Sequence, residues 1–354
     1  MIDVDEKYYD AVDLLKRMIA IPSFSREEDK VALLIEDYIR QNSHTPHRIG
    51  NNVWVQSPGF DTAKPTILLN SHIDTVKAVA GWTKEPFAPL EEEGILYGLG
   101  SNDAGASVVS LLHTFFLLTE KPQDYNLIFL ASCEEEVSGT NGAELALTKL
   151  PPITFGIVGE PTGMHPAVAE KGLMVLDCTV KGRSGHAARN EGENAIYKAL
   201  KDIEWFRTFE FPKKSHLLGS VKMSVTMISS GTQHNVVPDR CEFVVDVRSN
   251  ELYSNEELFH LIDEMTGCEV KPRSFRLNSS RIALENPFVE RAIIIGKEPY
   301  GSPTLSDQAF MKFPSVKIGP GDSARSHTAD EYIKLEEIRE AIELYYKLLD
   351  GLRL

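Results

Sequence analysis

Three glutamates directly follow one of the most apolar runs in the chain. Residues 127–131 (Leu-Ile-Phe-Leu-Ala) are typical of a strand buried on both faces, and Glu134, Glu135 and Glu136 come just after it. Carboxylates near an apolar core are costly unless cations, metals or protons match them. This run therefore indicates either metal ligands with a general base or a solvated loop that is merely acidic.

Two further apolar strands end in side chains that can do similar chemistry. Residues 66–71 run into His72 and Asp74, and residues 155–159 run into Glu160. Because residues two apart in an extended segment share a face, Asp74 can hold the imidazole of His72 in the orientation that a metal ligand needs. The alternative for this pair is a core histidine that a neighbouring aspartate satisfies.

The elements between these strands predict how the polar side chains are brought together. Strands alternate with helices, which favours a mostly parallel sheet whose strands end at one common edge. Two loops add candidates, since the glycine-dense residues 97–105 contain Asp103, and a Gly/Ser-rich loop after the strand at 316–319 contains His327. Ser25-Arg26-Glu27-Glu28 has the form of a capping box for the helix that follows it. Other helices are predicted at 8–20, 105–118, 193–209, 254–266, 287–297 and 335–349.

The pattern changes at about Gly172. From there the strands alternate apolar and polar residues, which indicates one buried and one exposed face. Such strands are predicted at 172–181, 221–229 and 241–248. Together with two of the helices they predict a small α+β sandwich inserted into the larger α/β domain. We therefore expect a catalytic metal-binding domain formed by 1–171 and 281–354, with an inserted α+β domain at 172–280.

The composition is that of an ordinary globular protein, with 42% hydrophobic and 25% charged residues in a chain of 354. The net charge of −15 disfavours a nucleic-acid partner and an anionic membrane surface. The four cysteines are scattered, so we expect neither a disulfide framework nor a thiolate zinc site. The first residues lack the apolar core of a secretory signal, and no apolar run could span a bilayer. These features predict a soluble cytoplasmic protein.

Seven short motifs, in their order along the chain, resemble those of the co-catalytic zinc deacylase and exopeptidase family. That family includes acetylornithine deacetylase, succinyl-diaminopimelate desuccinylase, glutamate carboxypeptidase and aminoacylase. The resemblance covers nearly the whole chain. It implies a mostly parallel mixed sheet flanked by helices, with the inserted domain as a lid and dimerisation domain. The motifs are Ser71-His72-Ile73-Asp74, Gly98–Asp103, Glu134-Glu135-Glu136, Gly159-Glu160-Pro161-Thr162, Gly185-His186-Ala187, Asn235-Val236-Val237-Pro238, and Gly319-Pro320-Gly321-Asp322 leading to His327-Thr328.

The resemblance implies two divalent metal ions, most often zinc, with cobalt or manganese as possible substitutes. His72 and Glu160 would hold one ion, Glu136 and His327 would hold the other, and Asp103 would bridge them. Imidazole and carboxylate ligands suit these metals. A bridging carboxylate can hold two cations at the ~3.5–4 Å spacing of two-metal hydrolytic sites.

The resemblance also implies roles for residues that hold no metal. Glu135 matches the family's general base, which takes a proton from water and passes it to the leaving amine. Asp74 would orient His72. His186 matches a histidine that stabilises the oxyanion, often across a dimer interface. The family has a cis peptide after its bridging aspartate, so we expect one at Asp103–Ala104.

Two predicted substrate contacts lie in the inserted domain. Arg248 matches the arginine that grips the substrate α-carboxylate, and Asn235 would lie in the same cleft. The alternatives are a strand-face salt bridge for Arg248 and a turn residue before Pro238 for Asn235. Departures from the family pattern at Leu99 and Ala104-Gly105 border the cleft and bear on substrate choice.

We therefore expect a zinc-dependent amidohydrolase that deacylates an N-acyl-L-amino acid, the small-molecule partner of the chain. An N-acetyl or N-succinyl derivative of ornithine, citrulline or lysine, in arginine or lysine biosynthesis, matches the acetylornithine deacetylase-like branch. A homodimer through the inserted domain is expected by analogy. The alternatives are a metal-dependent dipeptidase or carboxypeptidase and, in another class, a catalytically inactive metal-binding scaffold.

Overall fold

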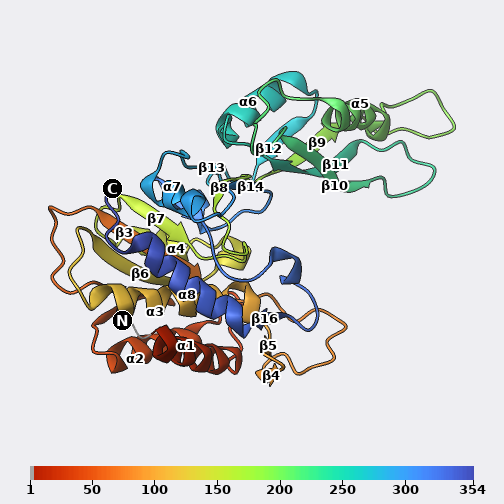
Figure 1. Ribbon diagram of the computed structural model, residues 1–354. Helices are drawn as coiled ribbons and strands as arrows, with labels where there is room; N and C mark the ends of the chain where they lie inside the picture. The colour runs from red at the N-terminus through yellow and green to blue at the C-terminus, as the bar shows by residue number, and fades with distance from the viewer. Residues whose placement is uncertain (1–3) are drawn as a thin grey trace. The chain divides into compact units, whose positions relative to one another are not determined.

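The main sheet of the molecule has nine strands (Figure 1). The computed structural model describes residues 4–354. The strands of this sheet are β1 (Pro46–Ile49), β2 (Asn52–Gln56), β3 (Thr66–His72), β6 (Asn126–Ser132), β7 (Phe155–Val158), β8 (Ala167–Glu170), β13 (Ser280–Arg281), β14 (Tyr300–Ser302) and β15 (Ser315–Lys317). Their order is β1-β2-β6-β3-β7-β15-β8-β13, and β14 pairs with β8.

The centre of this sheet is parallel and its margins are antiparallel. β6, β3, β7 and β15 run parallel to one another, whereas β2 is antiparallel to β6 and β8 is antiparallel to β15. The predicted α/β fold class with a mostly parallel mixed sheet is confirmed. A separate antiparallel sheet joins β4 (Leu90–Glu92), β5 (Ile95–Tyr97) and β16 (Tyr332–Lys334).

Helices cover both faces of the parallel strands. The helices here are α1 (Val4–Ile19), α2 (Asp29–Gln41), α3 (Ala106–Thr119), α4 (Ala143–Leu147), α7 (Pro287–Ile294) and α8 (Leu335–Leu349). α3 is buried at every position from Ala106 to Leu118, because it lies between strands β3 and β6 and helices α1 and α8 (Figure 1). On the other face, Ala146 of α4 packs with Leu68 and Ile128. Across the described residues, no helix has the length and apolar character of a membrane span.

The chain divides into two compact units. Unit 1 consists of the residues up to Val168 together with Ile282–Tyr300 and Ser306–Leu354. Unit 2 consists of Ala169–Arg281 and Gly301–Leu305. The inserted part thus begins at Ala169 and ends at Arg281, where the sequence predicted 172 and 280. The short return segment at 301–305 was not predicted, because its packing depends on contacts distant in sequence.

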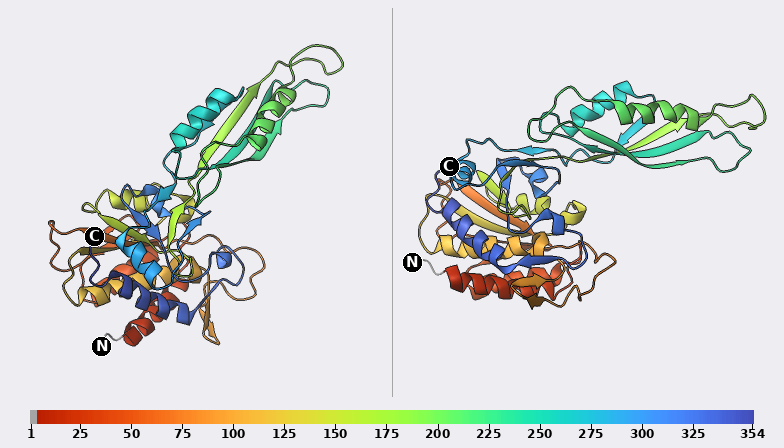
Figure 2. Two further views of the ribbon diagram at one scale, coloured as in Figure 1. Left: turned by 45° about the horizontal axis from the view of Figure 1, so that its top comes forward. Right: turned by 45° about the vertical axis from the view of Figure 1, so that its right-hand side comes forward.

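Unit 2 is a four-stranded antiparallel sheet with two helices on one face (Figure 2). Its elements are β9 (Met174–Lys181), α5 (Ala195–Thr208), β10 (Lys222–Ser230), β11 (Arg240–Arg248), α6 (Asn255–Met265) and β12 (Glu269–Pro272), and the strand order is β10-β11-β9-β12. Phe243, Val245 and Val247 are buried in the core with the helices, whereas Asp246 and Arg248 are not buried. We call the side of the sheet that carries Asp246 and Arg248 the open face.

Candidate metal centre

Three neighbouring strands deliver polar side chains to one edge of the main sheet. β3 ends at His72, β6 ends at Ser132 shortly before Glu136, and β7 ends at Val158 two residues before Glu160. Because β6, β3 and β7 are adjacent and parallel, their carboxyl ends meet at the same edge. The structure therefore brings together the strand ends that the sequence analysis singled out.

Two trios of side chains that share Asp103 are arranged so that each could hold a metal ion. In the first trio, Nε2 of His72 lies 3.2 Å from Oδ1 of Asp103 and 3.8 Å from Oε1 of Glu160. In the second, Nε2 of His327 lies 3.0 Å from Oε2 of Glu136 and 3.8 Å from Oδ2 of Asp103. Asp103 presents one oxygen to each trio, which is the geometry of a bridging ligand. All five predicted ligands are thus gathered in unit 1.

The electrostatics of this cluster fit divalent cations. Oε1 of Glu160 is buried without a hydrogen-bond partner in the described chain, and such an atom is costly unless something else binds it. Burial raises the pKa of Glu160 to about 8, and the charges of Asp103 and Glu136 act in the same direction. The hydrogen bond to Glu136 raises the pKa of His327 to about 9. Carboxylates crowded with imidazoles suit zinc, cobalt or manganese.

Asp74 orients both a ligand and the segment that carries the proposed base. The ring of His72 donates from Nδ1 to the carbonyl of Asp74 at 2.9 Å, which leaves Nε2 for the ligand cluster. Burial alone would lower the pKa of His72, but hydrogen bonds to Asp103 and Asp74 raise it well above its usual value. The carboxylate of Asp74 accepts the backbone N–H groups of Glu135 at 3.0 Å and Glu136 at 3.1 Å.

The predicted capping box at Ser25–Glu28 is wrong, and its residues serve the site instead. Ser25 donates its hydroxyl to Asp74 at 2.7 Å, and α2 begins without a side-chain cap. Glu28 accepts the backbone N–H groups of Arg26 and Glu134 at 2.7 and 3.1 Å. The local pattern of the sequence predicted a helix cap. Instead, Ser25 binds a carboxylate 49 residues away, and Glu28 binds the backbone of the neighbouring Arg26 and of Glu134, which is 106 residues away.

Glu331 holds the loop of the bridging ligand, and the sequence analysis missed it. Its buried carboxylate accepts backbone N–H groups from Gly100 at 3.1 Å and from Asn102 and Asp103 at 2.9 Å each. Burial raises the pKa of Glu331 to about 7, although these three donors oppose that effect. The peptide bond Asp103–Ala104 is cis, which confirms the prediction.

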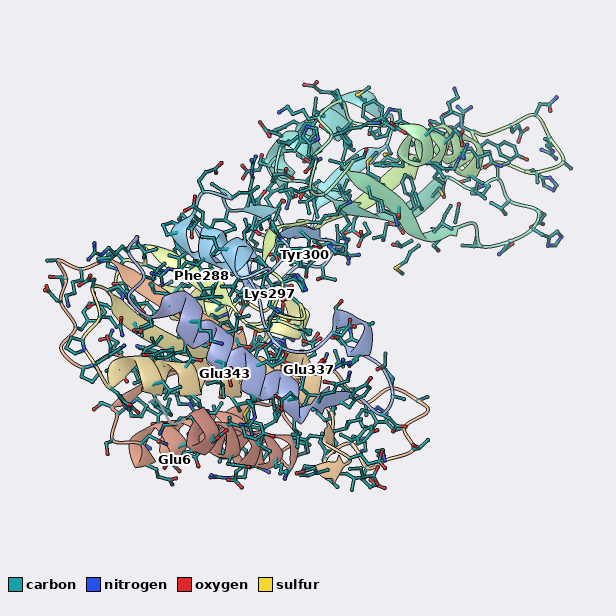
Figure 3. All side chains as sticks on the ribbon, viewed as in Figure 1. Glu6, Phe288, Lys297, Tyr300, Glu337 and Glu343 are labelled. Carbon is teal, nitrogen blue, oxygen red and sulfur yellow. The ribbon has the colours of Figure 1, made fainter. Side chains whose placement is uncertain are left out.

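The loop that carries His327 is tied down on both sides. Arg325 pairs with Glu337 of α8 at 2.6 and 3.0 Å, and Figure 3 labels Glu337 near the start of that helix. Asn102 donates to the carbonyl of Asp322 and accepts its backbone N–H. The side chain of His327 is nevertheless 53% exposed, so the second trio is more open to solvent than the first.

Glu135 lies among buried carboxylates. Burial raises the pKa of Glu135 well above its usual value, the charge of His72 opposes this shift, and the charges of Glu160 and Asp307 add to it. Asp307, a second residue that the sequence analysis missed, accepts from Asn70 of β3 at 2.9 Å and from Ser132 of β6 at 2.7 Å. It therefore fixes the ends of the two strands that carry the ligands and the proposed base.

The three remaining predicted site residues lie in unit 2. His186 and Asn235 occupy two exposed loops that are joined by backbone contacts, since His186 bridges Val236 and the N–H of Ala187 donates to the carbonyl of Asn235 at 3.0 Å. Arg248 makes two hydrogen bonds to Asp246 on its own strand, at 2.8 and 3.1 Å. This strand-face pair is the arrangement that the sequence analysis had left open as an alternative.

Comparison with curated proteins gives relatives along the full chain. A putative succinyl-diaminopimelate desuccinylase DapE from Mycobacterium tuberculosis is 28% identical over 357 residues, which cover 97% of this chain and 98% of that protein. The acetylornithine deacetylase of Proteus mirabilis is 25% identical over 372 residues, which cover 96% of each chain.

Solved structures share the fold at lower identity. The aminopeptidase PepT of Bacillus cereus matches with a TM-score of 0.77 and 19% identity, over 97% of this chain and 98% of that chain. The YxeP protein of Bacillus subtilis, described as a dinuclear metal binding peptidase of the M20 family, matches with a TM-score of 0.74 and 17% identity over 98% of both chains. The model of peptidase family M20/M25/M40 matches residues 68–351, so the resemblance inferred from the motifs is confirmed and the chain belongs to this family of metal-binding hydrolases.

Proposed function

We propose that this hydrolase cleaves the amide bond of an N-acyl-L-amino acid and releases a carboxylate and a free amine. The observation that carries the proposal is the pair of ligand trios that share Asp103, together with the backbone hydrogen bonds by which Asp74 holds Glu135 and Glu136. The relatives named as desuccinylase and deacetylase support an N-acetyl or N-succinyl substrate. An ornithine, citrulline or lysine derivative in arginine or lysine biosynthesis is the substrate that we propose.

The residues of the chain divide the work as follows. Two metal ions, for which we propose zinc, would supply Lewis-acid chemistry and lower the pKa of water when bound. Glu135 takes a proton from the attacking water and delivers it to the amide nitrogen as the carbon–nitrogen bond breaks. Asp74 keeps the ring of His72 and the segment of Glu135 in place. We propose His186 as the donor to the developing oxyanion, and Arg248 and Asn235 as contacts of the substrate.

A substrate panel with metal-stripped protein tests this proposal. N-acetyl and N-succinyl derivatives of ornithine, citrulline, lysine and diaminopimelate are incubated with protein reloaded with zinc or cobalt, alongside dipeptides, and amine release is measured. Metal-dependent release from one acyl amino acid is the expected result. If amine is released from dipeptides only, the site residues stand as proposed, but the enzyme is a dipeptidase and not a deacylase. No release with metal bound would favour the inactive scaffold.

We also infer that two chains associate through unit 2. β10 is an edge strand of the four-stranded sheet, and it exposes Met227 and Ile228, while α5 exposes Tyr197 and Leu200. An apolar strand edge of this kind is a template for pairing with a second copy. The double variant M227E/I228E should change a dimer to a monomer in sedimentation equilibrium. A wild-type monomer at micromolar concentration would refute this inference.

A cytoplasmic location is the part of the proposal that the cysteines support. All four cysteines are free and buried in the described chain. Free thiols are typical of proteins that remain in reducing compartments.

A further inference from the structure

The carboxylate of Asp330 joins two loops of unit 1 that are far apart in the sequence. Its Oδ1 accepts the backbone N–H groups of Thr83 at 2.8 Å and Lys84 at 3.0 Å, and its Oδ2 accepts the hydroxyl of Thr83 at 2.6 Å. We call these three bonds the Asp330 clamp. Hydrogen bonds to an ionised carboxylate are stronger than those between neutral groups. The Asp330 clamp therefore holds the chain firmly at a point three residues after the candidate ligand His327.

The backbone of the His327 loop depends on such contacts. His327 and Asp330 both have a positive φ, at 59° and 55°, in the left-handed region. Residues other than glycine adopt this conformation where surrounding contacts enforce it. Before His327, the loop is held through Asp322 and Arg325. After His327, it is held through Glu331, which binds the Asp103 loop, and through the Asp330 clamp, which binds the loop that follows β3.

The segment that the Asp330 clamp binds is itself anchored. Nζ of Lys84 donates to Glu92 of β4 at 2.8 Å and lies 4.2 Å from the ring centroid of Tyr97 of β5. Tyr97 is the cross-strand partner of Tyr332 in β16, the strand that begins two residues after Asp330. β4, β5 and β16 form one sheet (Figure 1). Asp330 therefore connects the candidate ligand loop to a small sheet at both ends of the contact.

The two ligand trios do not depend equally on the Asp330 clamp. His72 of the first trio ends a strand of the main sheet, and its side chain is 1% exposed. His327 of the second trio lies in a turn, and its side chain is 53% exposed. Loss of the Asp330 clamp would loosen the turn and leave the strand in place. A ligand that must be ordered when the ion binds costs conformational entropy, so the affinity for that ion falls.

We propose that Asp330 is a positioning residue that sets the affinity for the second metal ion, the one that Glu136 and His327 would hold, and leaves the affinity for the first ion unchanged. The proposal rests on the two-metal centre of the proposed function and is independent of the substrate. Side chains that orient metal ligands from outside typically change metal affinity about 10–100-fold, and we expect an effect of this size for the second ion.

The test begins with Asp330→Ala, which removes all three bonds. Metal-free protein is titrated with zinc in competition with a chromogenic chelator, which gives a dissociation constant for each ion. The ring signals of His72 and His327 in NMR spectra report which site each ion fills. We expect the constant of the His327 site to rise about 10–100-fold and that of the His72 site to stay within twofold.

Two milder variants grade the effect. Asp330→Asn keeps an acceptor oxygen for the N–H groups of Thr83 and Lys84, so it should restore nearly wild-type affinity. Thr83→Val removes only the hydroxyl bond, so its loss of affinity should lie between those of the other two variants. A Thr83→Val protein that binds zinc as weakly as Asp330→Ala, or an Asp330→Asn protein that does so, would contradict the role of these three bonds.

Asp350→Ala is the matched control. Asp350 also accepts hydrogen bonds from two residues of unit 1, Lys121 at 2.8 Å and Gln123 at 3.3 Å. Both donors precede β6, whose other end leads to Glu136, so this aspartate lies away from the ligand edge. Its loss should leave both constants unchanged. The proposal is overturned if Asp330→Ala stays within threefold of wild type at the His327 site, weakens both sites equally, or matches Asp350→Ala.

Hydrogen exchange of the metal-free protein separates a local change from unfolding. The amides of Thr83 and Lys84 should exchange slowly in wild type and rapidly in Asp330→Ala, whereas the amides of β3 stay slow in both. Rapid exchange at Thr83 and Lys84 in wild type would overturn the proposal. If the β3 amides also become rapid, the variant has lost its fold, and the affinity of Thr83→Val decides.

The same titration separates this proposal from the proposed function. Wild-type protein that binds fewer than two zinc ions would contradict the two-metal centre, and with it both proposals. Two ions bound with equal affinity by wild type and Asp330→Ala would contradict the positioning role of Asp330 alone.

Discussion

The two units hold their predicted functional residues in opposite ways. In unit 1 the ligand segments are fixed from behind by the buried carboxylates of Asp74 and Glu331, which accept five backbone N–H groups between them. In unit 2, His186 and Asn235 lie on exposed loops joined by backbone contacts. Hydrogen bonds within unit 1 therefore hold the segments of the candidate metal centre, whereas burial does not fix His186 and Asn235 of unit 2.

We expect the largest effect from a change at Glu135, the proposed general base. Glu135→Gln keeps the shape and removes the proton acceptor, so we expect turnover to fall by about 10²–10⁴-fold while both metal ions stay bound. Steady-state kinetics and elemental analysis of the same sample check this. Turnover close to wild type would exclude Glu135 as the base, and loss of metal would make it a ligand.

His186→Ala tests whether an exposed loop residue matters as much as a buried one. Loss of a donor to an oxyanion typically lowers kcat by about 10²–10³-fold, and we expect a fall of that size with unchanged thermal unfolding. His216→Ala, which removes another exposed histidine of unit 2, is the control. A change in kcat below threefold would break the comparison in favour of a catalytic site confined to unit 1.

Glu331→Gln tests the carboxylate behind the bridging ligand. The amide cannot supply the second acceptor oxygen that receives the N–H of Gly100, so the Asp103 loop should hold its ligand less well. We expect metal affinity to fall about 10–100-fold, measured by competition with a chromogenic chelator. The control is Glu336→Gln. The side chain of Glu336, in α8, is 67% exposed, so its change should leave the metal affinity unchanged. Equal affinity in both variants would reduce Glu331 to a merely structural role.

The smallest effect concerns a buried histidine of unit 1 outside the sheet edge. His113 is fully buried, donates from Nδ1 to the carbonyl of Val109 and accepts from the hydroxyl of Tyr38. Burial lowers its pKa to about 4. Between about pH 6.5 and 4 the imidazole of His113 is protonated in the unfolded chain but neutral in the folded chain. The contribution of His113 to the free energy of unfolding is therefore complete above about pH 6.5. It falls by about 1.4 kcal/mol for each pH unit from there towards 4.

Urea unfolding of wild type and His113→Gln at pH 7.5 and 5.5 checks this difference. The variant should lose about 1 kcal/mol less than wild type over this interval, because other titrating groups are common to both proteins. Identical losses would show that His113 is not kept neutral by burial. His72 is also buried, yet its pKa is raised, because Asp103 and Asp74 accept hydrogen bonds from its ring. The two histidines therefore differ in their neighbouring carboxylates and not in burial.

The sequence allowed the main elements and the strand-end ligand candidates to be predicted from local patterns, and the resemblance to a known family completed the predicted ligand set with Asp103 and His327. Continuous apolar runs predicted β3, β6 and β7, and their polar ends supplied His72, Glu136 and Glu160. The supporting residues gave no such signal. The partners of Glu331 lie about 230 residues away, and Asp307 binds two strands that lie 175 or more residues before it.

The capping box at Ser25 failed for the same physical reason. A hydroxyl near a helix start can bind the helix or a distant carboxylate, and only the packed fold decides which. The placement of Arg248 was likewise beyond local patterns. Arg248 pairs with Asp246 on its own strand and lies opposite Lys222 on β10. The second neighbour depends on strand register, which spacing along the sequence does not give.

The position of β15 also sets the order in which the protein can be made. This strand lies between β7 and β8 in the sheet, and His327 follows it, yet both are encoded after the whole inserted unit. A nascent chain that has finished β7 must extend through some 150 more residues, roughly ten to thirty seconds of translation, before β15 exists. Protease protection of chains stalled before and after Ser315 would reveal that interval. Until it ends, β7 is an open strand edge, and a chain cut short there has four of the five predicted metal ligands and no closed sheet to hold them.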